Sequence, residues 1–196
     1  MNLTTLSHVK ALLGRTPTET TDDYTLRALI EAVSAFAERY LNRGVEQKTR
    51  TEYHDLYEEQ TRVHLFGYPV ASIDGTGEGV WADSSWAYTS AVAATNYAVA
   101  GDGTLYFRYR LSAVGPRALK VIYIGGMAPS EEKMVARYPD ISEAVARQVL
   151  YLFNTRKHVG ESLEGVSPAS GWVRGDVGWL TGVKSVLDLY RCVVGA

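Results

Sequence analysis

The spacing of apolar residues changes twice along this chain, and that change limits the folds open to it. Apolar side chains recur every three or four residues over residues 22–43 and again over residues 140–158, as on one face of a helix. Between these segments, residues 48–126 contain short β-branched and aromatic runs separated by glycine and proline, which is typical of strands and turns. The sequence therefore predicts an α+β fold, with an antiparallel β region inserted into a helical body.

Further signals define the helical body. A shorter apolar repeat over residues 4–14 predicts a helix that precedes the other two. Asp140 and Glu143 have the spacing of a capping box, so we expect the third helix to begin at Asp140. Basic residues are favourable in the last turn of a helix, which accounts for their concentration just before Gly160. Residues 1–160 are therefore predicted to form a single domain.

Turn residues divide the β region into segments too close together for helical crossovers, so we expect antiparallel hairpins. The clearest strands are predicted at residues 63–66, 97–99, 105–109 and 119–124. The glycines of residues 75–79 predict a turn, because the helix that a phosphate-binding loop requires does not follow them. The thirteen tyrosines of the chain concentrate in this region, where they fit either cross-strand packing or a binding surface.

The last part of the chain differs in composition from the rest. Residues 161–182 contain five glycines, which leave the backbone flexible, together with Trp172 and Trp179, which a simple solvated linker does not need. The apolar repeat that follows, over residues 183–190, is too short to be stable as an isolated helix and has to dock on something. We therefore expect residues 161–196 to form a C-terminal arm that binds a partner.

Charge and composition argue against several classes of function. Twenty lysines and arginines against 22 aspartates and glutamates leave a net charge of −2, which argues against a protein that binds nucleic acid by neutralising phosphates. The longest uncharged stretch, residues 84–101, is rich in serine, threonine, asparagine and glycine, so we expect no membrane span. Cys192 is the only cysteine, which excludes an internal disulfide, and no base is assigned to activate it as a nucleophile.

One group of residues has the side-chain types of a metal site. It comprises His54, Asp55, Glu58, Glu59 and His64. Two histidines flanking acids fit zinc held across a hairpin, whereas the lack of compact ligand spacings favours a solvated hairpin edge. We therefore expect no metal, no cofactor and no enzymatic activity, with a zinc hydrolase built on this cluster as an alternative.

The order of the segments is more specific than any one of them. The chain reads LTTLSHVKALLG, then DDYTLRALIEAVSAFAERYLNRGV, then ALKVIYIGGMAP, then DISEAVARQVLYLFNTRKHVG, and finally VLDLYR. Together these segments resemble the tailed-phage head-tail connector family, whose members are also called adaptor or head-completion proteins. In its second helix the family has a pattern like D-D-x-x-L-x-x-L-I-x-A-A that ends in tyrosine and glycine. The residues that match it are Asp22, Asp23, Leu26, Leu29, Ile30, Ala32 and Tyr40.

Two later motifs extend the resemblance. The family has a strand of the type V-x-Y-x-x-G followed by a proline, and a closing L-x-x-Y-R element. The residues similar to them are Val121, Tyr123, Gly126 and Pro129, and then Leu187, Tyr190 and Arg191. The resemblance covers nearly the whole chain, except for residues 74–96 and 161–182, which have no counterpart.

The resemblance implies a structural virion protein of the phage neck that is assembled in the host cytoplasm. Twelve copies would form a ring below the portal protein, extend the DNA channel and provide a docking platform for the stopper or tail-completion protein. Double-stranded DNA would pass through without specific binding. The residues expected to bind the portal are Trp172, Trp179, Val183, Val186, Leu187 and Tyr190. Those expected at the subunit interface or the channel are Arg147, Arg156, Lys157, Glu161 and Glu164.

Two other classes of function remain as alternatives. One is a tail or baseplate structural component with a β-rich binding surface, which would be found in the particle away from the portal. The other is a nucleic-acid-binding module, whose affinity for DNA would depend strongly on salt.

Overall fold

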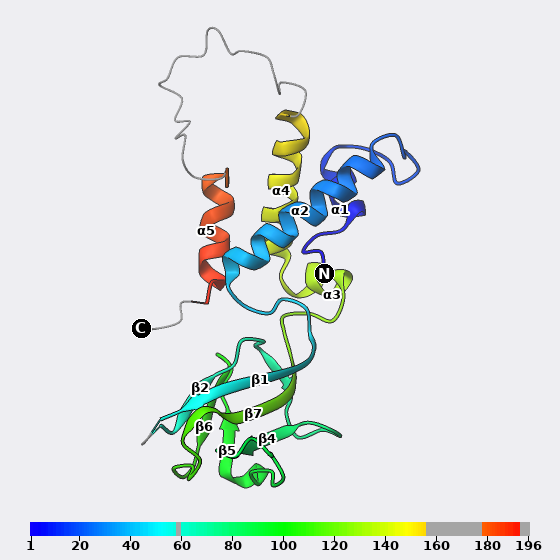
Figure 1. Cartoon of the computed structure of the whole chain (residues 1–196). Helices are drawn as coiled ribbons and strands as arrows, with labels where there is room; N and C mark the ends of the chain where they lie inside the picture. The colour runs from blue at the N-terminus through cyan, green and yellow to red at the C-terminus, as the bar shows by residue number, and fades with distance from the viewer. Residues whose placement is uncertain (58–59, 156–177, 193–196) are drawn as a thin grey trace. The chain divides into compact units, whose positions relative to one another are not determined.

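The structure is a computed structural model that describes residues 1–57, 60–155 and 178–192 (Figure 1). It divides into two compact units, which we describe separately. The helical unit consists of Met1–Leu41 and the described residues of Glu131–Ala196, and the β unit is Asn42–Ser130. Helices fill the first unit and antiparallel sheets the second, so the predicted α+β fold is confirmed.

Five helices form the described part of the helical unit. They are α1 (Leu6–Leu12), α2 (Asp23–Leu41), α3 (Glu131–Arg137), α4 (Pro139–Thr155) and α5 (Thr181–Tyr190). The helices predicted over residues 4–14, 22–43 and 140–158 correspond to α1, α2 and α4. The sequence does not predict α3, because Met134 is its one buried residue and leaves no apolar repeat to recognise.

The core of the helical unit lies where α2, α4 and α5 pack together, and Figure 1 shows these helices side by side. The apolar repeat of α2 supplies Leu26, Ile30, Val33, Ala37 and Leu41 to this core. The repeat of α4 supplies Ile141, Ala144, Val145, Val149 and Phe153. Because burial of one such aliphatic or aromatic side chain contributes about 1.5–3 kcal/mol, packing between helices holds the unit together.

A buried lysine fixes the connection between α1 and α2. Lys10 is 4% exposed, and its ammonium group donates hydrogen bonds to the carbonyl oxygens of Pro17 (3.2 Å) and Glu19 (2.6 Å). It also forms an ion pair of 2.6 Å with Asp23 at the start of α2. A buried charge needs such partners because it has lost its hydration. Lys10 therefore holds the polar connector and the first turn of α2 against α1.

α4 begins one residue earlier than the sequence predicts. Pro139 starts the helix, and proline suits a first helical position because its φ is fixed and it has no N–H to satisfy. Asp140 consequently lies inside the first turn, where its carboxylate accepts a hydrogen bond of 2.8 Å from the Tyr190 hydroxyl. Glu143 pairs instead with Arg147. The predicted capping box is therefore wrong.

Two antiparallel sheets form the β unit. In the first, the strand order is β1 (Lys48–Leu56), β7 (Gly115–Gly125) and β3 (Val70–Ser72), and β4 (Gly79–Ala82) also pairs with β7. In the second, the order is β2 (Arg62–His64), β6 (Thr104–Phe107) and β5 (Tyr97–Val99), with the 3-10 helix η1 (Ala94–Asn96) before β5. The five strand pairs of these sheets are antiparallel, as predicted. The predicted turn is also present, with the Glu78 N–H donating to the Gly75 carbonyl oxygen at 3.0 Å.

The core of the β unit contains side chains from both sheets. They include Leu56, Val63, Leu65, Val80, Leu105, Phe107, Leu119 and Val121. Tyr123 is also fully buried, and its hydroxyl accepts a hydrogen bond from Gly67 N–H (2.7 Å) and donates one to Glu52. Glu52 also accepts from the Phe66 N–H (3.1 Å) and lies 3.1 Å from His54 Nε2. Burial raises the pKa of Glu52, but the hydrogen bonds from His54, Tyr123 and Phe66 outweigh it and lower the pKa.

Main-chain hydrogen bonds join the two ends of the β unit. The Met127 N–H donates to the Val45 carbonyl oxygen at 2.7 Å, and the Gln47 N–H donates to the Ala128 carbonyl oxygen at 2.8 Å. The β unit is therefore an insertion between α2 and α3 whose entering and leaving segments lie side by side.

Candidate interaction site between α4 and α5

Two buried side chains hold α5 on the helical unit. Val183 is 2% exposed and Leu187 is fully buried, on the side of α5 that packs against α4 and α2. The sequence assigns both residues to a partner-binding arm, but the structure places them in the interior of the unit itself. Their contact with a portal protein remains a prediction, and it would require α5 to leave this position.

A buried glutamine fixes the chain just before α5. The Gln148 side chain in α4 donates to the Gly178 carbonyl oxygen (2.6 Å) and accepts from the Leu180 N–H (3.0 Å). Trp179, between these two residues, stacks on the Phe36 ring of α2 with the ring centroids 4.8 Å apart. The two hydrogen bonds and the stacked rings thus position the segment that leads into α5.

The C-terminal half of α5 is held by polar contacts. Besides its hydrogen bond to Asp140, Tyr190 packs edge-on against Tyr138 at a centroid distance of 5.8 Å. The Tyr40 hydroxyl donates to Asp188, and this hydrogen bond raises the pKa of Tyr40. α5 is consequently held at both ends, and its N-terminal half borders an open space.

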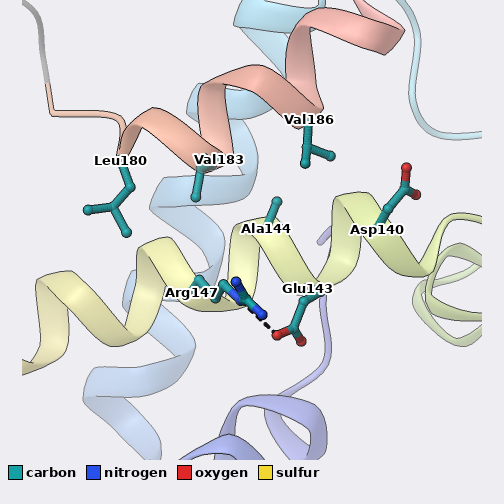
Figure 2. Close-up of a pocket in the computed structure, with 8 residues that line it drawn as sticks. Asp140, Glu143, Ala144, Arg147, Leu180, Val183 and Val186 are labelled. Atoms are coloured by element: carbon teal, nitrogen blue, oxygen red, sulfur yellow. Dashed lines mark hydrogen bonds and ion pairs between the residues drawn. The ribbon is translucent and has the colours of Figure 1, made fainter.

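That space is an apolar groove between α4 and α5, with a volume of about 420 Å³ (Figure 2). Its lining residues are Asp140, Glu143, Ala144, Arg147, Leu180, Gly182, Val183 and Val186. Figure 2 shows Val183 and Val186 of α5, and Leu180 just before it, extending towards α4, where Ala144 faces them. The groove exists because Ala144 and Gly182 have too little side chain to fill the gap between the two helices.

Charged residues of α4 border the groove. Glu143 accepts a hydrogen bond from Arg147 Nε (2.8 Å) and lies 3.0 Å from His8 Nε2 of α1. The hydrogen bond from Arg147 is the largest influence on the pKa of Glu143, which it lowers against the effect of burial. The side chain of Arg147 is 67% exposed. An apolar floor bordered by charged side chains is the pattern that protein interfaces commonly show.

The structure brings some of the predicted site residues together. Arg147, Val183 and Val186 share the groove, whereas Trp179 and Tyr190 lie at the two ends of α5. Five more lie outside the described residues, namely Arg156, Lys157, Glu161, Glu164 and Trp172. Leu189, which the sequence analysis did not single out, is 79% exposed. It follows Val186 by three residues, and this spacing places both side chains on one side of α5.

The hairpin cluster is divided among other contacts. His54 pairs with Glu52, Asp55 accepts a hydrogen bond of 2.8 Å from the Arg117 N–H, and the His64 ring lies 5.1 Å from that of Tyr68. Glu58 and Glu59 lie outside the described residues. Within the part of the chain that the structure describes, no group of three or more His, Cys, Asp or Glu side chains could hold a metal ion. Nor does any described helix have the length and apolar character needed to cross a bilayer.

The tyrosines of the β unit fit both of the roles proposed for them. Tyr123 belongs to the core, whereas Tyr53, Tyr57, Tyr106 and Tyr109 are 41% to 69% exposed. Part of the tyrosine-rich region is therefore available as a surface.

No protein-family model and no curated protein matches this sequence. Solved structures with a similar fold include a chain from the neck of an empty gene transfer agent (GTA) particle computed with C6 symmetry. The TM-score is 0.59 at 15% identity, over 97% of this chain and 90% of that chain. A chain from the virion of a native GTA particle has a TM-score of 0.58 at 14% identity, over 97% of this chain and 90% of that chain. A chain from the neck of a native GTA particle computed with C12 symmetry gives 0.54 at 14% identity, over 88% and 84%. At these identities the comparisons establish a shared fold, which agrees with the fold that the resemblance implied.

Proposed function

We propose that this chain is a structural protein of a phage-like particle and forms the head-tail connector ring of its neck. The observation that carries the proposal is the likeness to a neck chain over 97% of this chain and 90% of that one. Such coverage includes both the helical unit and the β unit, so the likeness is not confined to one common helical motif. The protein acts as an assembly component and carries out no catalysis.

The ring would contain twelve copies and lie below the portal protein. Symmetric rings favour assembly because each bound subunit raises the effective concentration of the next contact. A similar chain belongs to a neck computed with C12 symmetry, which supports this copy number. The net charge of −2 suits a channel through which DNA slides, since a ring rich in lysine would hold the phosphates.

One side of α5 is the proposed docking face for the portal or the stopper. Gly182, Val186 and Leu189 follow one another at four- and three-residue spacing and therefore share this side. The groove would receive an apolar side chain of the partner, and Leu189 would extend the apolar contact beyond it. Arg147, which is exposed at the edge of the groove, would pair with a carboxylate of the partner or of the neighbouring subunit.

The test is co-assembly of the full chain with the portal protein of its own particle, followed by native mass spectrometry. Wild type should form a complex with a ring-sized number of copies. Leu189→Asp should lose that complex and stay folded, because it places a charge in an exposed apolar contact. Tyr24→Asp is the matched control, since Tyr24 is 88% exposed on α2 and its variant should assemble normally.

Two results would contradict the proposal in different ways. If wild type forms no complex with the portal, and electron microscopy of labelled particles finds it away from the neck, the chain is a tail or baseplate component. If the complex forms but tolerates Leu189→Asp, the neck role stands and the docking face lies elsewhere. Truncation after residue 160 would be uninformative, because it removes Val183 and Leu187 from the core of the helical unit.

A further inference from the structure

The outer face of the first sheet carries a cluster that lies outside the hydrophobic core of the β unit. Its members are aromatic or cationic, and we call them the aromatic platform: Tyr53, Trp81, Trp86, Tyr88, Arg117 and Lys120. Lys120 of β7 lies directly opposite Tyr53 of β1 on one side and Trp81 of β4 on the other. Cross-strand neighbours project from the same face of a sheet, so these three strands contribute to one surface.

The two cations of the platform rest on its aromatic rings. The Arg117 guanidinium lies 4.3 Å from the centroid of the Tyr53 ring. The Lys120 ammonium lies 5.3 Å from the Trp81 ring and 5.4 Å from the Tyr88 ring. The Tyr53 and Tyr88 rings are themselves 5.9 Å apart. Both cations are thus positioned by attraction to the faces of the rings.

The backbone under the platform is unusual. Among the described residues other than glycine, four have a positive φ, and three of them are Trp86 (63°), Tyr88 (48°) and Arg117 (52°). Large side chains rarely adopt this conformation. Specific contacts hold it here, since Trp86 Nε1 donates to the Pro116 carbonyl oxygen at 2.9 Å and the Tyr88 hydroxyl donates to that of Arg117. Backbone held in such a conformation is characteristic of functional sites.

The charges of the platform are incompletely paired. Neither Arg117 nor Lys120 forms an ion pair with a carboxylate in the described residues of the β unit. A guanidinium stacked on a ring uses its flat face, which leaves the N–H donors in its plane for a bidentate carboxylate. The β unit as a whole carries eight basic and nine acidic residues, so it has no excess of cations with which to neutralise nucleic-acid phosphates.

We propose that the aromatic platform binds an acidic segment of a partner protein. Carboxylates of the segment pair with Arg117 and Lys120, and its apolar side chains contact the exposed rings of Tyr53 and Trp86, which are 41% and 59% exposed. Tryptophan, tyrosine and arginine are the residues that most often dominate the energy of protein interfaces. This inference does not depend on the neck assignment, because it rests on residues 53–120 alone.

The experiment follows the indole N–H resonances of the full-length chain during titration with a short synthetic peptide that alternates glutamate and leucine. The resonances of Trp81 and Trp86 should shift saturably, whereas that of Trp179 in the helical unit should not. A peptide with glutamine in place of glutamate should bind more weakly. The double variant Arg117→Gln, Lys120→Gln should lose roughly fivefold in affinity for each cation removed. Arg62→Gln, which removes an exposed cation from β2, is the matched control and should bind as wild type does.

Several results would overturn the proposal. Equal binding of the two peptides would show that carboxylates are not recognised, and unchanged affinity in the double variant would show that the two cations are not involved. Absence of saturable shifts up to millimolar peptide would exclude the site. Tighter binding of a short duplex DNA than of the acidic peptide would identify the platform as a nucleic-acid surface instead.

Discussion

The packing of α5 is tested most directly by two leucines of the same helix. Leu187 is fully buried, whereas Leu189, two residues later, is 79% exposed. We compare Leu187→Ala with Leu189→Ala, because the two changes remove the same atoms and alter helix propensity equally. Any difference between the variants therefore measures the surroundings of each side chain.

The structure sets the expected magnitudes. Replacing a fully buried leucine by alanine removes its burial and leaves a cavity, which together cost about 3–5 kcal/mol. The same change at an exposed site costs less than about 0.5 kcal/mol. For a chain of this length, each kcal/mol corresponds to about 2–4 °C in melting temperature, so Leu187→Ala should melt roughly 10 °C below wild type.

The assay is urea and thermal unfolding followed by far-ultraviolet circular dichroism, which reports helix content. Leu189→Ala should unfold at the same urea concentration and temperature as wild type, and Leu187→Ala should unfold at a much lower urea concentration and temperature. Equal effects of the two changes would refute the packing described for α5. Such a result would favour the alternative in which residues 161–196 form an arm whose apolar residues face a partner.

Three further changes test other contacts. Gln148→Leu should lower the free energy of unfolding by about 2–4 kcal/mol, because the Gly178 carbonyl and the Leu180 N–H lose their hydrogen-bond partner. It should also speed amide exchange at Leu180, and unchanged exchange there would contradict the role given to Gln148. Folding lowers the pKa of Glu52, so the ionised carboxylate stabilises the folded state. This stabilisation is complete above about pH 4.5 and is lost as the pH falls through the folded-state pKa. In urea unfolding, Glu52→Gln should therefore be less stable than wild type at neutral pH, and the difference in unfolding free energy should narrow in acid. A difference that does not depend on pH would contradict the stabilising role of the Glu52 carboxylate. Lys10→Met should cost about 3–5 kcal/mol in the same assay, because it leaves Asp23 without its buried partner, and a neutral effect would show that Asp23 is solvated.

Periodicity predicted the parts of the fold whose burial is one-sided and regular. The stripe through Leu26, Ile30 and Val33 has helical spacing, and the predicted segment 119–124 carries the apolar alternation of β7. β1 gave no such signal because the face that includes Glu52 and His54 is polar. Glu52 is accommodated by hydrogen bonds from Tyr123 and Phe66, which are distant in sequence, and His54 by its contact with Glu52.

At the candidate site too, sequence spacing does not reveal which distant residues a side chain contacts. The spacing of Val183 and Leu187 indicates that these residues are buried, but it does not indicate whether a partner or the chain itself covers them. Gln148 gave no signal at all, because a single polar residue in an apolar repeat reads as an exposed position. The platform residues Trp81 and Trp86 come from the stretch without a counterpart in the resemblance. Strand pairing places Trp81 beside β7, and a hydrogen bond to the Pro116 carbonyl oxygen places Trp86 there.

The insertion of the β unit between α2 and α3 has a consequence for biosynthesis. A ribosome makes α1 and α2 and then the whole of Asn42–Ser130, so the part of the apolar stripe of α2 that packs on α4 and α5 stays uncovered until those helices emerge. The pairing of Val45 with Met127 shortens the loop that must close before α2 and α4 can meet. Folding of the β unit is thus expected to precede and speed closure of the helical unit. A slow-folding β unit would prolong the time during which the nascent chain exposes apolar surface to chaperones and to aggregation.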